Sequence, residues 1–156
     1  MGTPYIASGG FADGRGLVAA LALGAEGINM GTRFMCTEEA PIHQNIKQAI
    51  VEADERSTAL LYRPFRNTAR VFKNEVAIEV NRRETNPDVK FDDIKELVAG
   101  TRGRQSYITG DKDYGIWSAG LALGLINDIP TCEELVNRIS LDAEDIIRKR
   151  FTQLVQ

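Results

Sequence analysis

Two short apolar segments, each ending at a glycine and separated by one helical stretch, constrain the fold of this chain most strongly. Residues 5–8 are apolar and lie between a proline and a glycine, so they predict a buried strand. Residues 27–31, GINMG, predict a second buried strand. Asp13 is placed to cap a helix over residues 14–23, and Gly24 ends that helix. A strand, a helix and a strand in so few residues predict a βαβ unit, in which the two strands run parallel.

Glycines stand where each of these strands ends, and they predict a place for an anion. Gly9 and Gly10 follow the first strand, and Gly31 and Thr32 follow the second. The ends of neighbouring parallel strands lie side by side, and glycine leaves backbone N–H groups open to a phosphate while tolerating a positive φ. The same glycines are also typical of turns that only connect strands to helices. Their occurrence at two successive strand ends favours a phosphate site of the kind found after the last two strands of a (β/α)8 barrel.

Composition narrows the class of protein. The chain has 156 residues, enough for one domain with a core, and 43% of them are hydrophobic. Its formal net charge of −3 argues against a nucleic-acid partner, because nucleic-acid binders carry a basic excess. No apolar run reaches the length of a membrane span and the N-terminal residues lack the order of a signal peptide, so we expect a cytoplasmic protein with no membrane partner. Cys36 and Cys132 form no CxxC pair, which argues against a disulfide framework or a zinc site.

The rest of the chain predicts mostly helices. The clearest is the last one, where Thr131 and Glu134 have the spacing of a capping box after a proline. The other expected elements are a helix over residues 42–55, a strand over 58–62, helices over 67–83, 91–99 and 117–126, and a loop over 100–111.

Several motifs resemble one enzyme family. SGGFADGRG and MGTRF, with their separation and flanks, resemble the C-terminal barrel segment of the nitronate monooxygenases, formerly called 2-nitropropane dioxygenases. The resemblance continues through RPFRNTARVFKNEVA and GIWSAGLALGLINDIPTCEELVNRI, so it covers nearly the whole chain. It implies an α/β fold: the C-terminal portion of an FMN-binding TIM (β/α)8 barrel, with its last two strands, and a mostly helical C-terminal region.

The resemblance also implies a cofactor and a reaction. The FMN phosphate would be held by backbone amides of Gly9 and Gly10 from the first loop and of Asn29, Met30, Gly31 and Thr32 from the second, with the Thr32 hydroxyl as an extra donor. Members of the family oxidise alkyl nitronates, which are small molecules, with molecular oxygen and without a metal. The related flavin-dependent enoyl-acyl-carrier-protein reductases instead take hydride from NADH or NADPH. The protein's share of such chemistry is positioning and electrostatics around the flavin.

By the same resemblance, residues 5–8 and 27–31 are the seventh and eighth barrel strands, and the first six strands have no counterpart. A full barrel needs about 250 residues. The family's catalytic histidine belongs to the part without a counterpart, so we expect the chain alone to be inactive. It is then a truncated or split reading frame, a non-catalytic remnant, or a subunit that another chain or self-association completes.

The resemblance also implies a division of the chain into three parts. Residues 1–57 would hold the last part of the barrel and the phosphate site. Residues 58–112 would form a small substrate-side region, either α/β or helical, and residues 113–156 would form helices that pack on the barrel.

Four other side chains invite a chemical role and also have a structural interpretation. His43 is the only histidine, but it stands at the start of a helix, where we expect a surface or helix-terminus role. Cys36 follows the second loop and lacks a histidine and acid partner set, so we expect a small buried thiol. Glu38 and Glu39 are adjacent, so their side chains diverge, and we interpret them as helix-start charges.

An arginine cluster leaves two interpretations open. It faces a phosphate-bearing substrate or a nicotinamide phosphate, or it is a solvated face that pairs with nearby acids. The cluster consists of Arg63, Arg66 and Arg70, with Tyr62, Phe65 and Phe72 interleaved. Leu121 stands where many relatives have a glutamine, so we expect no ligand contact from it.

Overall fold

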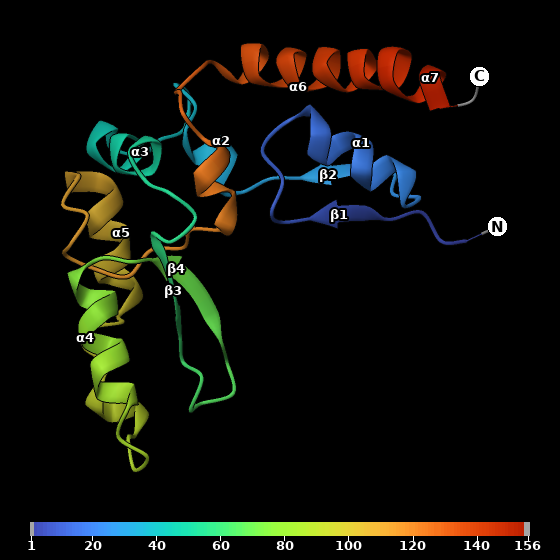
Figure 1. Ribbon diagram of the computed structural model, residues 1–156. Coiled ribbons are helices and arrows are strands. Elements are labelled where there is room, and N and C mark those ends of the chain that lie inside the picture. The colour runs from blue at the N-terminus through green and yellow to red at the C-terminus, as the bar shows by residue number, and fades with distance from the viewer. Residues whose placement is uncertain (1, 155–156) are drawn as a thin grey trace. The chain divides into compact units, whose positions relative to one another are not determined.

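The computed structural model describes residues 2–154, and the chain divides into two compact units (Figure 1). One unit joins the residues up to Ala40 with those from Asp128 onward, and the other comprises Pro41–Asn127. The division into 1–57, 58–112 and 113–156 that we expect from the sequence stays a prediction. Within residues 2–154, no helix is both long enough and apolar enough to cross a membrane.

The first unit begins with the expected βαβ arrangement. Strand β1 (Ile6–Ser8), helix α1 (Gly14–Ala22) and strand β2 (Gly27–Asn29) follow one another, and β1 pairs with β2 in parallel. The Asp13 carboxylate accepts a hydrogen bond of 3.1 Å from the Gly16 N–H and so caps α1. Gly24 has a φ of +91°, which a side chain would disfavour. The βαβ unit, its cap and its closing glycine are therefore confirmed.

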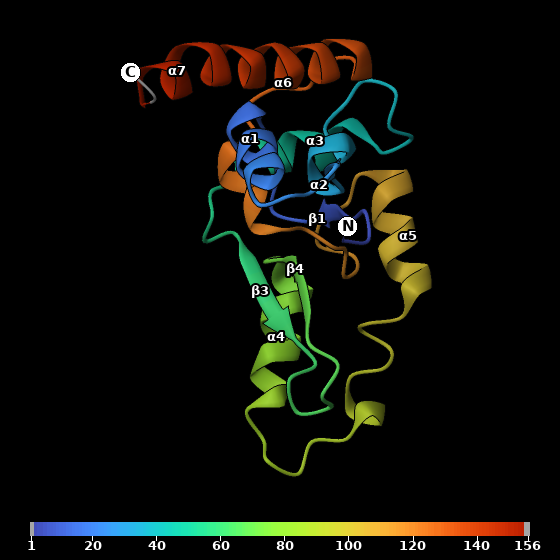
Figure 2. The same cartoon turned by 90° about the vertical axis from the view of Figure 1, so that its right-hand side faces the viewer.

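The same unit is completed by α2 (Thr32–Met35), α6 (Cys132–Ile146), the π-helical turn η3 (Ile147–Phe151) and α7 (Thr152–Leu154). The capping box of Thr131 and Glu134 is present at the start of α6. Helix α6 packs along α1, as both ribbon views show (Figures 1 and 2). The approach is close at Gly14, where a Cβ atom would lie 2.7 Å from the Ala143 nitrogen. The residues buried in this packing are Val18, Ala20, Leu135, Ile139 and Ala143.

The expectation that both strands of this unit are buried is wrong for this chain. Ile6 in β1 is 63% exposed, and Ser8 and Asn29 at the strand ends are exposed as well. A strand is buried when other strands flank it and layers cover both of its faces. Here the sheet has two strands, so each has a free edge.

The second unit is built around an antiparallel hairpin. Strand β3 (Thr58–Leu61) pairs with β4 (Ala69–Phe72), and helix α4 (Glu75–Glu84) packs on β3 (Figure 2). Helix α3 (Gln44–Val51) precedes the hairpin, and η1 (Phe91–Asp93), α5 (Gly100–Thr109) and η2 (Leu121–Leu125) follow α4. The core consists of Ala59, Leu61, Val71, Val76, Ala77, Val80 and Ile94. The predicted strand over 58–62 is confirmed, and the predicted helix over 42–55 is the shorter α3.

The single helix predicted over 67–83 is wrong, because residues 69–72 form a strand and only residues 75–84 are helical. Valines at helical spacing do occur here, but β-branched residues suit a strand that has a partner. Strand β4 pairs with β3, and the Phe72 N–H also donates to the Trp117 carbonyl. Asn74 separates the two elements: its buried side chain caps α4 at Ala77 and donates to two backbone carbonyls of residues 112–115.

The loop predicted over 100–111 is also wrong, because residues 100–109 form α5. Its glycines indicate a loop by composition, but they serve packing and the helix end. A Cβ atom at Gly103 would lie 2.2 Å from the Ile116 carbonyl oxygen, and Gly110 ends the helix with a φ of +78°. Conversely, the helices predicted over 91–99 and 117–126 are only the short 3₁₀ turns η1 and η2.

Candidate functional site

The two glycine-containing loops leave the same edge of the β1–β2 sheet. The parallel register pairs Ile6 with Gly27 and Ser8 with Asn29. The loop at Gly9 and the loop at Met30 therefore begin side by side. The Gly9 N–H donates to the Asn29 carbonyl at 3.2 Å, which extends the ladder by one bond.

The glycines of these loops face open space. Gly9 and Gly10 have φ values of +88° and +83°, a region in which side chains are disfavoured. A Cβ atom at Gly9, Gly10 or Gly31 would meet no atom within 4 Å, and all three residues are exposed. Within residues 2–154, no atom therefore fills the space that these glycines leave. That arrangement fits a ligand that comes close to the backbone.

The other predicted phosphate residues lie at the same strand end. The Asn29 side chain donates to the Ser8 hydroxyl at 3.1 Å, so it ties the two strand ends together. Met30 and Thr32 are half-buried, and Thr32 is the first residue of α2. The Gly9 N–H is used within the sheet, so the prediction that Gly10 and the loop through Met30 to Thr32 hold a phosphate does not need it.

The start of α1 is less open to an anion than the sequence suggests. The Asp13 carboxylate occupies it, bonding to the Gly16 N–H and pairing with Arg15. Partial burial raises the pKa of Asp13, but the hydrogen bonds from Arg15 and Gly16 outweigh it and hold that pKa below its ordinary value. The carboxylate is thus ionised and already satisfies this helix end. A phosphate would meet the strand-end loops rather than the α1 terminus.

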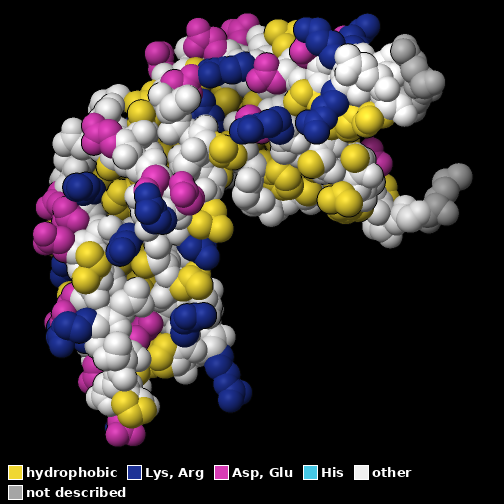
Figure 3. Space-filling model, viewed as in Figure 1, with side chains coloured by type: hydrophobic (Ala, Val, Ile, Leu, Met, Phe, Trp, Pro, Cys, Tyr) yellow, Lys and Arg dark blue, Asp and Glu magenta, His cyan; other side chains and the backbone are white. Residues whose placement is uncertain are grey.

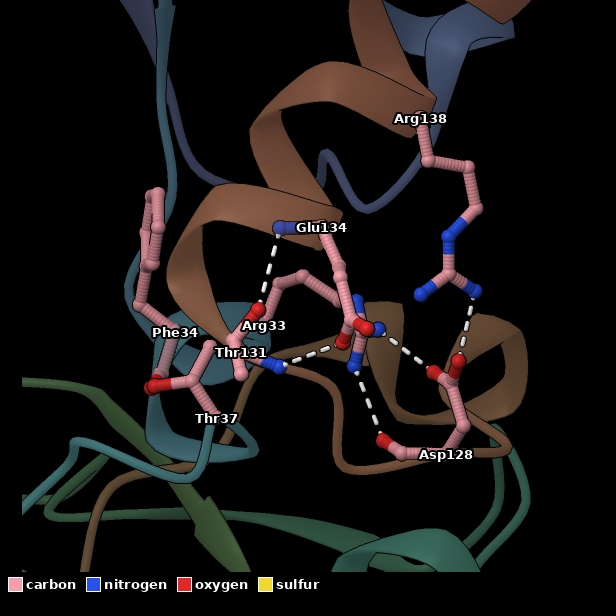
Figure 4. A network of polar contacts seen from close by, with 7 residues as sticks. All are labelled: Arg33, Phe34, Thr37, Asp128, Thr131, Glu134 and Arg138. Atoms are coloured by element: carbon pink, nitrogen blue, oxygen red, sulfur yellow. Dashed lines mark hydrogen bonds and ion pairs between the residues drawn. The ribbon is translucent and has the colours of Figure 1, made fainter.

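A buried arginine that the sequence analysis does not single out anchors the second loop. Arg33, in MGTRF, is only 3% exposed, and its guanidinium pairs with the Asp128 carboxylate at 2.5 Å and donates to the Asp128 carbonyl at 3.1 Å. Arg138 of α6 pairs with the other carboxylate oxygen, as Figure 4 shows. Burial raises the pKa of Asp128, but the hydrogen bond from Arg138 and the charges of both arginines outweigh it and lower that pKa. The only signal in the sequence for this buried ion pair is the position of Arg33 inside the motif MGTRF, where the neighbouring residues are uncharged.

Cys36, Glu38 and Glu39 have structural positions in this unit. Cys36 is fully buried and forms no disulfide bond, so the expected small buried thiol is confirmed. The Glu38 N–H donates to the Pro130 carbonyl at 3.0 Å. Both carboxylate oxygens of Glu39 lie 2.9 Å from the Cys132 nitrogen. Glu39 is thus a helix-start charge, but it serves α6, which lies far along the sequence.

His43 belongs to the other unit and caps α3. Its Nδ1 atom accepts a hydrogen bond of 3.1 Å from the Asn45 N–H, and its backbone N–H donates to the Tyr107 carbonyl. The imidazole also covers Gly110, where a Cβ atom would lie 2.2 Å from Nδ1. The expected helix-terminus role is confirmed. Among residues 2–154, no group of three or more His, Cys, Asp or Glu side chains could hold a metal ion.

The arginine cluster does not act as one set. Arg70 donates to the Thr58 hydroxyl across the hairpin at 2.8 Å. Arg63 and Arg66 lie exposed in the turn between β3 and β4. Leu121, which we expect to make no ligand contact, is exposed at the start of η2.

Comparison with known proteins shows which family this geometry belongs to. The family model described as nitronate monooxygenase matches residues 1–142. The chain belongs to the nitronate monooxygenase family. A nitronate monooxygenase of Metarhizium robertsii is 32% identical over 158 residues, which cover 94% of this chain and 43% of that protein.

Other proteins similar to this chain are named for different activities. A protein of Mycobacterium tuberculosis named (3aS,4S,5R,7aS)-5-hydroxy-7a-methyl-1-oxo-octahydro-1H-indene-4-carboxyl-CoA dehydrogenase is 28% identical, over 91% of this chain and 50% of its own length. Among solved structures, FabK from Thermotoga maritima matches with a TM-score of 0.86 and 33% identity, over 96% of this chain and 47% of that one. Nitroalkane oxidase from Streptomyces ansochromogenes is 21% identical with a TM-score of 0.70, over 93% and 40% of the two chains, and supports the fold alone.

The chain spans at most about half the length of the relatives it matches. The family is one of oxidoreductases, and this member has the mixed α/β and helical fold of part of such an enzyme.

Proposed function

We propose that this chain carries the phosphate-binding part of an FMN-dependent oxidoreductase that oxidises alkyl nitronates with molecular oxygen. The observation that supports it best is the shared strand end where Gly10 and Gly31 face open space from neighbouring loops. Family membership supports a flavin oxidoreductase in general. When bound, FMN would supply the electron transfer between the substrate and oxygen.

The residues of this chain would hold and orient the cofactor. Backbone N–H groups of Gly10 and of the loop through Met30, Gly31 and Thr32 would donate to the phosphate, and the Thr32 hydroxyl would add one donor. Gly9 would contribute space rather than an N–H, because that group already bonds to Asn29. Hydrogen bonds to a charged phosphate are among the stronger ones in proteins.

We also propose that β1 and β2 are the last two strands of a TIM (β/α)8 barrel, whose other strands come from another polypeptide segment or from self-association. The free edges of the β1–β2 sheet and the exposed Ile6 support this. Without the other strands, the chain alone would bind FMN weakly. It would also lack activity, because the unit with the glycine loops contains no histidine.

A reductase reaction with NADH or NADPH is the second candidate. The high structural similarity to FabK and the sequence similarity to a named dehydrogenase favour it. Fold by itself does not decide between oxidase and reductase chemistry. Oxygen consumption with an alkyl nitronate, compared with anaerobic NADH or NADPH oxidation, would separate the two once FMN is bound.

The test of the cofactor site is an FMN titration followed by visible absorbance and flavin fluorescence. We expect Gly31→Val to weaken FMN binding at least about tenfold, because the side chain would enter the space for the phosphate. Gly31 has a φ of −92°, so valine adds no backbone strain there, unlike at Gly10 with its φ of +83°.

The matched control is Gly100→Val. Gly100 is also exposed with no atom within 4 Å of a Cβ position, but it starts α5 in the other unit. We expect it to leave FMN affinity unchanged. Equal FMN affinities of the unaltered chain and the Gly31→Val variant would mean that the loops only connect strands and helices. If the chain showed no bound-flavin absorbance at any FMN concentration, that result would support a non-catalytic remnant.

A further inference from the structure

The second glycine loop is followed directly by a buried ion pair. Arg33 comes two positions after Gly31, and its side chain is only 3% exposed. Its guanidinium pairs with the Asp128 carboxylate at 2.5 Å and donates to the Asp128 carbonyl at 3.1 Å. A Cβ atom at Gly31 would meet no atom within 4 Å, so the guanidinium does not fill the space beside that glycine. Arg33 therefore acts on the loop through the backbone.

Further contacts join the residues after the loop to the segment that leads into α6. The Glu38 N–H donates to the Pro130 carbonyl at 3.0 Å, and the Glu39 carboxylate accepts from the Cys132 N–H at 2.9 Å. Figure 4 shows the ion pair that lies between α2 and this segment. Of these contacts, the ion pair is the one formed next to the loop. Its partner residues lie 95 positions apart in the chain and belong to the same unit.

The glycine makes the loop depend on such an anchor. Gly31 has a φ of −92° and a ψ of −72°, and glycine has more freedom to leave a given conformation than any other residue. A loop that must be ordered when a ligand binds loses affinity, because the lost conformational entropy opposes binding. A guanidinium that makes two bonds to one residue fixes orientation as well as distance. The Arg33–Asp128 pair can therefore keep the loop ordered before a ligand arrives.

We propose that Arg33 and Asp128 are positioning residues for the phosphate of the flavin cofactor. The pair holds the loop through Met30, Gly31 and Thr32 in the conformation whose backbone N–H groups meet the phosphate. Neither side chain of the pair would touch the phosphate. This inference rests on the proposed function, because it assigns a role toward the phosphate site proposed there.

The sign of one substitution separates positioning from a simple effect of charge. Asp128→Asn removes a negative charge close to the loop. If the pair acted through charge alone, this variant would attract a phosphate more strongly. If the pair positions the loop, the variant binds the phosphate more weakly, because a neutral amide holds a guanidinium less firmly than a carboxylate does. We expect the weaker binding.

Fluorescence titration of the full chain with FMN and with riboflavin tests the proposal. Riboflavin has the same ring system without the phosphate, so the ratio of the riboflavin Kd to the FMN Kd measures what the phosphate contributes. We expect a ratio of at least about ten in the unaltered chain. Asp128→Asn should lower the ratio at least about fivefold by weakening FMN binding, with riboflavin binding unchanged. A general loss of folding would weaken the binding of both flavins, so a changed ratio reports on the phosphate loop.

Two further variants keep the test independent of how well Asp128→Asn folds. Arg33→Lys keeps the positive charge, but an ammonium group lacks the planar fork of a guanidinium, so this variant should also lower the ratio. In a Gly31→Val background, which already blocks the phosphate, adding Asp128→Asn should change the ratio less than about twofold.

The matched control is Asp145→Asn. It removes the same charge from an ion pair in the same unit, because Asp145 pairs with Lys149 at 2.7 Å. Both side chains are exposed, and Figure 3 shows acidic and basic side chains interspersed along α6. We expect this control to leave the ratio unchanged, since the pair does not contact the loop or α2.

The possible results separate the two proposals. If the unaltered chain bound FMN no more tightly than riboflavin, or bound neither, the proposed phosphate site would be wrong, and this inference with it. If the unaltered chain preferred FMN and both Asp128→Asn and Arg33→Lys kept that preference, only the positioning role would be wrong. Tighter FMN binding by Asp128→Asn would also overturn it, because the pair would then act through charge.

Discussion

At the scale of single residues, one buried cation decides how two distant segments meet. Arg33 is almost fully buried, and Asp128 is its carboxylate partner although they are 95 positions apart in the chain. We expect Asp128→Asn to lower the free energy of unfolding by about 2 kcal/mol, less than for a fully buried pair because Asp128 is partly exposed. Urea unfolding at pH 7 measures this, with Arg138→Gln as the control expected to cost less than about 1 kcal/mol.

The same pair predicts a pH dependence. The pKa of Asp128 is lower in the folded chain than its ordinary value of 3.8, so its stabilisation is fully present above that pH and is lost as the pH falls through the folded pKa. The difference in unfolding free energy between the unaltered chain and Asp128→Asn should therefore shrink at pH 3 and below. A difference that is the same at pH 3 and pH 7 would show that the carboxylate charge does not contribute.

At the scale of elements, the position of α5 depends on Gly103, although the glycine-containing sequence around it is typical of a loop. A Cβ atom at Gly103 would lie 2.2 Å from the Ile116 carbonyl oxygen, a backbone atom that cannot turn aside. In a free helix, Gly103→Ala would stabilise by about 1 kcal/mol. Here we expect it to destabilise by about 1–3 kcal/mol, because the added methyl group overpacks the contact.

Thermal or urea unfolding checks this sign. Gly100→Ala is the matched control, since it lies in the same helix and its Cβ position is open. It should be neutral or slightly stabilising. If both alanine variants stabilised the chain equally, α5 would not approach Ile116 as closely as described.

At the scale of the whole chain, exposed apolar side chains on the first unit predict self-association. Ile6 and Leu23 are 63% and 81% exposed, and the β1–β2 sheet has unpaired edges. Such edges and patches pair with other chains. We expect oligomers at low micromolar concentration by sedimentation velocity or light scattering.

The variant that tests this edge is Ile6→Lys, which should shift the chain toward monomer. Ile78→Lys is the control, because Ile78 is 52% exposed on α4 and belongs to the other unit of the chain. A monodisperse monomer of the unaltered chain with cooperative unfolding would contradict the prediction.

The sequence correctly predicts features that depend on nearby residues, such as helix caps and turns. The Asp13 cap, the closing Gly24, the box of Thr131 and Glu134, and the parallel βαβ unit all depend on residues within a few positions or on a short connection. The helix-terminus role of His43 follows for the same reason. The family that the sequence motifs indicate is also confirmed.

Only the tertiary structure decided what depends on distant neighbours. Residues 69–72 are a strand because β3 and Trp117 pair with them, and the helix over residues 100–109 lies against Ile116 because residue 103 has no side chain. The exposure of Ile6, the partner of Arg33 and the helix that Glu39 serves are likewise set by segments far along the chain. Capping and turn preferences depend on a few neighbouring residues, so the local sequence predicts them. Burial and strand pairing depend on contacts between distant segments, and these contacts exist only once the chain has folded.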